Sequence, residues 1–136
     1  MTRAGVTPAG ATRARVFLGV TGAFFLALFA LPLFLVPFEW AEALGWDVER
    51  TDLGSYFGRC LGAVAIAISG QALWASHAPE RHGSLFTLLA AAAALLAVVH
   101  VRGLVEESQP LVEHLETAMY AGFAALALWC RPATAG

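Results

Sequence analysis

Residues 16–37 read VFLGVTGAFFLALFALPLFLVP, a run of 22 residues without a charged side chain. At 1.5 Å per residue, a helix of this length spans the hydrocarbon core of a bilayer, which is about 30 Å thick. A cleaved signal peptide is the alternative, because Ala41-Glu42-Ala43 has the small-x-small form of a cleavage site. The apolar run is longer than the roughly 7 to 15 residues typical of such peptides, so the sequence favours a retained transmembrane helix.

The composition of the whole chain indicates the same class of protein. Of 136 residues, 59% are hydrophobic and 13% are charged, and the mean hydropathy is +0.69. A soluble domain has about a quarter of its residues charged. The eight basic residues are all arginines and the net charge is −2, which excludes the basic groove that nucleic acids require. We expect one integral membrane domain with the lipid bilayer as its main partner.

The hydropathy pattern predicts an all-α transmembrane bundle of four helices joined by short loops. The expected helices cover about residues 16–37, 53–74, 84–101 and 111–130, between an N-terminal tail at 1–15 and a C-terminal tail at 131–136. The fourth helix is marginal, because its uncharged part, residues 118–130, is too short to span the membrane alone. It must include Glu113, His114 and Glu116, which a membrane tolerates when such groups face a bundle interior and have partners.

Arginine placement predicts the orientation of these helices. Five arginines lie in the two tails and in the turn at residues 75–83, whereas only Arg50 and Arg102 lie in the opposite loops, 38–52 and 102–110. The positive-inside rule therefore places both termini in the cytoplasm. The predicted location is the bacterial inner membrane, crossed several times.

The second expected helix carries Gly54, Gly58 and Gly62 at four-residue spacing. Such a row lets a neighbouring backbone approach closely, which matters where lipid removes the hydrophobic driving force between helices. Contact between helices of the same chain is the favoured interpretation, because a four-helix chain must first pack its own helices. A homodimer face or a surface for a membrane protein partner is the alternative.

Polar residues gather near the outer ends of three helices. Arg59 and Glu116 lie at similar depths, roughly 9 Å and 8 Å from their helix ends, so antiparallel helices would bring them together as a charge pair. Helical spacing puts Glu113, Glu116 and Tyr120 on one face. His100 shares a helix face with Ala93 and Ala97, whose small side chains leave space beside it. The candidate ligand-binding residues are Arg59, Glu113, Glu116, Tyr120, His100 and Tyr56.

This polar cluster has two interpretations. In the first it is a small site open to the outer half of the bilayer, with Arg59 as an anchor for an anion or a carbonyl and a glutamate as a proton acceptor. In the second it is a structural ion pair, or a set of side chains that extend to the headgroups. No metal site and no cofactor is predicted. A quinone stays open as a ligand, as does a haem held by His100 and His114, although two histidines without a motif are weak evidence.

Two segments support a family resemblance. Residues 56–62, YFGRCLG, and 109–117, QPLVEHLET, in a four-helix chain of this size resemble the small bacterial membrane proteins grouped as DoxX-like. Some DoxX-type proteins are associated with quinone-linked thiosulfate oxidation. The resemblance therefore implies an accessory subunit of a redox system.

The predicted function is a non-enzymatic binding or accessory subunit whose polar cluster, near the periplasmic side, holds a lipid or quinone headgroup. The alternative is a membrane-embedded enzyme that uses a glutamate for acid-base chemistry and Arg59 to stabilise negative charge. A small transporter is a second alternative. It is disfavoured because such proteins need ionisable residues along a path through the membrane, and residues 16–37 have none.

Overall fold

The computed structural model describes residues 8–106 and 112–132, and this part of the chain is helical without strands. The prediction of an all-α fold is confirmed. The elements in chain order are α1 (Pro8–Phe25), the π-helix η1 (Leu26–Ala30), α2 (Leu31–Leu35), α3 (Pro37–Ala43), α4 (Asp52–Ala75), the 3-10 helix η2 (Pro79–Arg81), α5 (Gly83–Glu106) and α6 (Val112–Cys130).

Three helical segments of the described chain are long and apolar enough to cross a membrane. They cover Pro8–Leu35, Asp52–Ala75 and Gly83–Val105, and 18-residue stretches within them have mean hydropathies of 2.3, 1.2 and 2.2. The length and composition of these helices therefore confirm the prediction of a membrane protein with transmembrane helices. Among the described helices, α6 is long enough but not apolar enough to be counted with these three, because its first two turns carry two glutamates and a histidine.

Two predicted helix ends differ from the structure. The first helix begins at Pro8, so residues 8–15 belong to it and not to a tail. The third continues to Glu106, so the first part of the loop expected at 102–110 is helical. The expected outer loop at 38–52 begins as helix α3. Residues 1–7, 107–111 and 133–136 lie outside the described residues.

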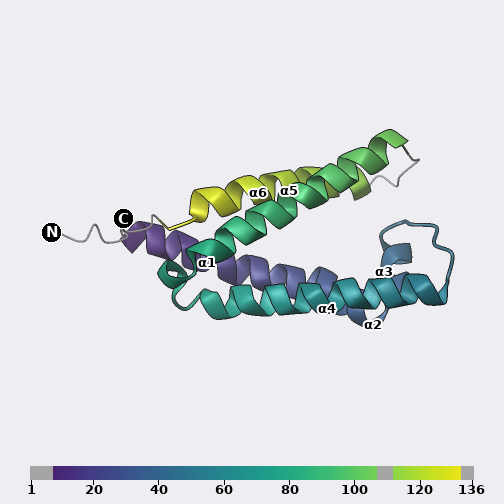
Figure 1. Ribbon diagram of the computed structural model, residues 1–136, viewed down its shortest axis with the longest axis horizontal. Helices are drawn as coiled ribbons and strands as arrows, with labels where there is room; N and C mark the ends of the chain where they lie inside the picture. Colours follow the sequence, from purple (N-terminus) through teal and green to yellow (C-terminus); the bar gives the residue numbers. More distant parts are fainter. Residues whose placement is uncertain (1–7, 107–111, 133–136) are drawn as a thin grey trace.

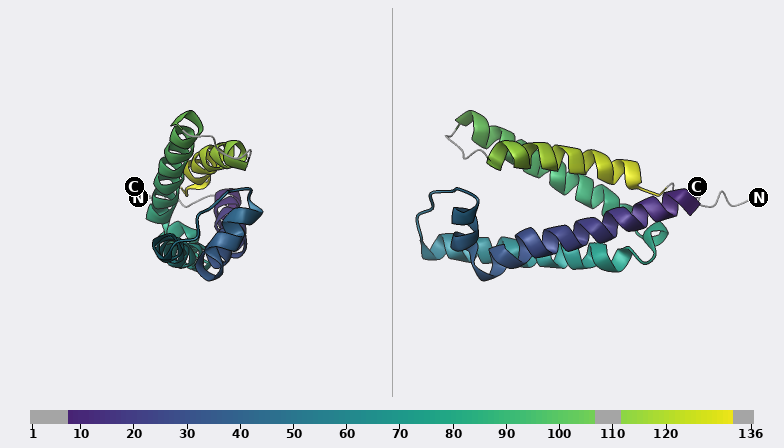
Figure 2. Two further views of the ribbon diagram at one scale, coloured as in Figure 1. Left: turned by 90° about the vertical axis from the view of Figure 1, so that its right-hand side faces the viewer. Right: turned by 180° about the vertical axis from the view of Figure 1, so that it is seen from behind.

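The helices form two antiparallel pairs (Figure 1). One pair consists of α4 and the segment α1–η1–α2, and the other consists of α5 and α6. Figure 2 shows that the two pairs lie close together where α1 begins and α6 ends, and that they separate toward α3. The backbones of the two pairs therefore diverge toward the end of α5 and the start of α6 (Figure 2).

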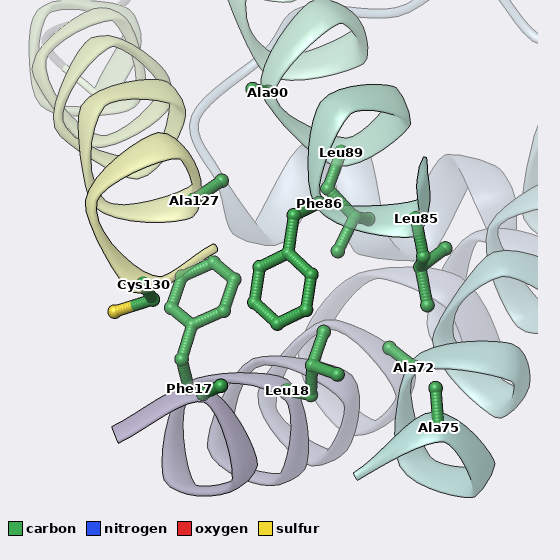
Figure 3. Packing of buried hydrophobic residues seen from close by; sticks show 11 residues of the cluster. Phe17, Leu18, Ala72, Ala75, Leu85, Phe86, Leu89, Ala90, Ala127 and Cys130 are labelled. Carbon is green, nitrogen blue, oxygen red and sulfur yellow. The ribbon is translucent and has the colours of Figure 1, made fainter. Parts of the chain in front are cut away.

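The main hydrophobic core lies where the two pairs meet (Figure 3). Phe86 of α5 is fully buried and stacks on Phe17 of α1 with ring centroids 5.8 Å apart. Small residues, among them Ala72 of α4 and Ala127 of α6, allow the helices to approach this aromatic pair. Because Cys130 belongs to the same cluster, the end of α6 lies beside the start of α1.

The irregular end of the first helix follows from Pro32. Proline has no N–H, and its ring displaces the carbonyl four residues earlier, which is that of Leu28. The π-helical turn η1 covers this position, and the Leu28 carbonyl accepts a hydrogen bond from Trp40 Nε1 at 2.8 Å. Val36 then leaves the helical conformation before Pro37, so α3 starts in a new direction.

A short hydrogen-bonded cap organises the acidic segment after α3. Gly45, at φ 91°, ends α3 by allowing backbone N–H groups to reach the carbonyls of its last turn. Arg50 donates to Glu39 at 2.8 Å and to Glu42 at 2.9 Å. The pKa of Glu39 is lowered, first by a backbone hydrogen bond and then by the bond from Arg50, while the two glutamates raise the pKa of Arg50. These three side chains are exposed, so the ion pairs orient the segment more than they stabilise it.

The glycine row of α4 faces the end of the first helix. A Cβ atom at Gly62 would lie 2.5 Å from the backbone nitrogen of Phe34, and one at Gly58 would lie 2.7 Å from Pro37 Cβ. Both distances are far inside van der Waals contact. The row therefore forms a close contact between helices of one chain, as the favoured interpretation expects.

Candidate functional site

An imidazole and two carboxylates meet between α5 and α6. His100 lies near the end of α5, and Glu113 and Glu116 lie one turn apart at the start of α6. His100 Nδ1 is hydrogen bonded to Glu113 Oε2, and His100 Nε2 lies 3.7 Å from Glu116 Oε2. Only 2% of Glu113 and 9% of Glu116 is exposed. We call these three residues the His–Glu cluster.

Helical spacing and the α5–α6 pairing explain why this cluster forms. Glu113, Glu116 and Tyr120 occupy one face of α6, and that face is turned toward the interior. The Tyr120 ring stacks on the His100 imidazole with centroids 5.0 Å apart and planes at 17°. His114, one residue further round the helix, is exposed, as its spacing predicts. Tyr120 therefore packs on a face of the imidazole, and the two glutamates face its two nitrogen atoms.

The charge of the His–Glu cluster is unbalanced. In the described part of the chain, His100 is the only basic side chain that forms an ion pair with either glutamate. Glu116 accepts no hydrogen bond from the described residues. Two buried carboxylates beside one imidazole are costly in a low-dielectric region unless a proton or a cation compensates them. The cluster is therefore suited to holding a proton, a cation or a hydrogen-bond donor.

An apolar cavity of about 130 Å³ lies next to the cluster. Tyr120 belongs to both, since it lines the cavity and stacks on His100. Leu96, one helical turn before His100, lines it as well. All four long helices contribute to the wall, through Thr21, Gly22, Phe25, Ala65, Ile68, Ser69, Ala72, Leu89, Ala92, Ala93, Leu96, Tyr120 and Phe123.

Arg59 and Tyr56 lie elsewhere. Both are exposed on α4 and line a separate hollow of about 360 Å³ with Phe34, Asp52, Ser55 and Cys60. The charge pair expected between Arg59 and Glu116 is not formed among the described residues, because the partner of Glu116 is His100. The physical reason is the pairing of the helices. Because α4 packs against the first helix and α6 packs against α5, Arg59 of α4 stays exposed and Glu116 faces His100.

Two aromatic residues of the cavity were not singled out from the sequence. Phe25 and Phe123 line it and are in T-shaped contact at 5.3 Å. In a membrane helix a phenylalanine that faces a cavity has the same local pattern as one that faces lipid. The alanine run at residues 90–94 is a sequence feature that indicates the cavity, because alanine side chains are too small to fill the interior.

Comparison with known proteins identifies no relative. No protein-family model matches the chain, and neither a curated protein nor a solved structure is significantly similar to it. The resemblance to DoxX-like proteins therefore stays a prediction.

Proposed function

We propose that this chain is a non-enzymatic binding or accessory subunit of the bacterial inner membrane, and that it holds the ring of a quinone-type amphiphile. One observation carries the proposal: Tyr120, which stacks on His100 of the His–Glu cluster, lines an apolar cavity shared by four helices. A headgroup with oxygen atoms and an apolar body needs this combination of polar groups beside an apolar space.

We also propose four crossings, with α6 as the fourth and both termini in the cytoplasm. Arg13 of α1 lies over the Trp129 ring of α6 at 4.3 Å, so the end of α6 returns to the level where α1 begins. Burial of Glu113 and Glu116 against α5 keeps their charge away from lipid, which supports insertion of a helix that is too polar to insert alone. The arginine bias supports the orientation.

Size and charge favour a quinone over a phospholipid as the ligand. A cavity of about 130 Å³ is close to the engineered apolar cavity of about 150 Å³ that binds benzene, so it suits a single six-membered ring. A phosphate would meet like charge from two glutamates, whereas a quinone carbonyl accepts hydrogen bonds and a quinol hydroxyl donates them. Tyr120 offers a donor, and Glu116 offers an acceptor.

The alternative of a membrane-embedded enzyme keeps one supporting observation. An imidazole held between two carboxylates is suited to proton transfer. The group expected to stabilise developing negative charge, Arg59, lines a different hollow. We therefore favour binding over catalysis.

Retention of a native ligand tests the proposed function. The chain has two tyrosines, which form a matched pair, because Tyr120 lines the cavity and Tyr56 is exposed on α4. We expect protein purified gently from its native membrane to retain a quinone, Tyr120→Phe to retain at least threefold less, and Tyr56→Phe to retain the wild-type amount. Quinone and phospholipid per protein would be measured by mass spectrometry. Equal retention by the two variants, or retention of a phospholipid alone, would contradict the proposal.

A further inference from the structure

We infer that the His–Glu cluster is a binding site for a divalent transition-metal ion such as Zn²⁺. Candidate ligand atoms, one each from His100, Glu113 and Glu116, lie within 4.8 Å of one another. The site uses the same cluster as the proposed function, but it does not depend on the amphiphile.

The 3.7 Å separation of His100 Nε2 and Glu116 Oε2 is the first argument. It is too long for a hydrogen bond. Two ligands on one tetrahedral Zn²⁺, each at about 2.0 to 2.2 Å from the metal, are about 3.4 Å apart. A shift of a few tenths of an ångström therefore brings the two atoms to the spacing that a shared metal ion requires.

The hydrogen bond at the other ring nitrogen is the second argument. When Nδ1–H of His100 donates to Glu113, Nε2 carries the lone pair and faces the carboxylate of Glu116. Two electron-rich atoms that face each other in a buried site repel each other unless a proton or a cation lies between them. Metal-binding histidines commonly have this arrangement, in which the second ring nitrogen donates to a carboxylate that fixes the tautomer.

Burial and charge are the third argument. Glu116 is 9% exposed and accepts no hydrogen bond from the described residues, although its carboxylate is turned toward the imidazole. One imidazole cannot neutralise two carboxylates, whereas a divalent ion can. Imidazole nitrogen and carboxylate oxygen are both ligands of Zn²⁺, so His100 Nε2 and Glu116 can hold the ion. Glu113 bonds the other ring nitrogen, so it orients the imidazole and adds negative charge beside the ion.

Titration of the purified, metal-free protein with Zn²⁺ tests this inference. We expect saturable binding of one ion by the wild type. Glu116→Gln and His100→Gln should raise the dissociation constant at least tenfold, and Glu113→Gln, which also loses the partner of the imidazole, should raise it roughly 10- to 100-fold. His114→Gln is the matched control, because His114 is exposed on the same helix, and it should bind as the wild type does. Circular dichroism would verify that each variant is folded.

The outcomes separate this inference from the proposed function. Absence of saturable Zn²⁺ binding by the wild type, or equal affinity in the cluster variants and in His114→Gln, would overturn the metal site whatever the protein retains from its membrane. Tyr120→Phe leaves His100, Glu113 and Glu116 in place, so it should retain less quinone and keep its Zn²⁺ affinity. Loss of Zn²⁺ affinity in Tyr120→Phe as great as in Glu116→Gln would contradict the assigned ligands.

Discussion

Gly62→Ala should strongly lower the thermal stability of the protein in detergent. The added Cβ would lie 2.5 Å from Phe34 N and 2.7 Å from Phe34 Cα, and a backbone cannot move aside as a flexible side chain can. Overpacking of this kind costs about 1–3 kcal/mol or more, so α4 and the end of the first helix must separate. Thermal unfolding followed by circular dichroism would measure the effect.

Gly70→Ala is the matched control in the same helix. A Cβ at Gly70 meets no atom within 4 Å, and alanine is favoured over glycine inside a helix by about 0.5–1 kcal/mol. This variant should therefore be as stable as the wild type or slightly more stable. Equal effects at the two glycines would mean that the row does not make the close contact. Loss of an oligomer without loss of stability in Gly62→Ala would favour the dimer interpretation.

His100→Leu should destabilise the protein by about 3 kcal/mol, because removal of one partner leaves a buried carboxylate without compensation. Glu113 is 2% exposed, and His100 is the basic side chain to which it is bonded in the described chain. The double variant His100→Leu/Glu113→Leu should recover much of this loss, since both polar partners are then removed. Denaturant or thermal unfolding of the two single variants and the double variant would measure the coupling.

Arg59→Ala is the control for this cycle. Arg59 is exposed and forms no ion pair with a described residue, so its removal should change stability by less than about 0.5 kcal/mol. A large loss of stability in Arg59→Ala, partly restored by adding Glu116→Ala, would instead support a charge pair between α4 and α6. The similar depths of the two residues in the membrane had suggested that pair. Strictly additive losses for His100 and Glu113 would contradict the coupling described here.

The all-helical character and the membrane class could be predicted because they depend on composition and on long uncharged runs. The run at residues 16–37 requires a helix in a bilayer whatever it packs against. The start of α1 at Pro8 could not be predicted in the same way. Residues 8–15 carry two arginines and small residues, so neither hydropathy nor periodicity separates a helix there from a tail.

The cluster was predicted in part. Spacing along α6 was enough to put Glu113, Glu116 and Tyr120 on one face, because helical periodicity is a local property. The side chain that contacts this face comes from another helix, so local spacing does not identify it. Depth in the membrane alone allowed either Arg59 or His100 as the partner of Glu116, and the choice depended on which helices pair. Since α4 packs against the first helix and α6 packs against α5, Arg59 is exposed and His100 becomes the partner.

The most direct test of the proposed site is to fill the cavity and titrate its ligand. Ala93 lines the cavity, whereas its neighbour Ala94 is exposed in the same alanine run, so leucine at each position adds the same atoms to a different face. A short-chain benzoquinone would be titrated into the protein in lipid nanodiscs by calorimetry. We predict saturable binding to the wild type and to Ala94→Leu, with at least tenfold weaker binding to Ala93→Leu. Binding to Ala93→Leu as tight as to the wild type would contradict the assignment of this cavity as the ligand site.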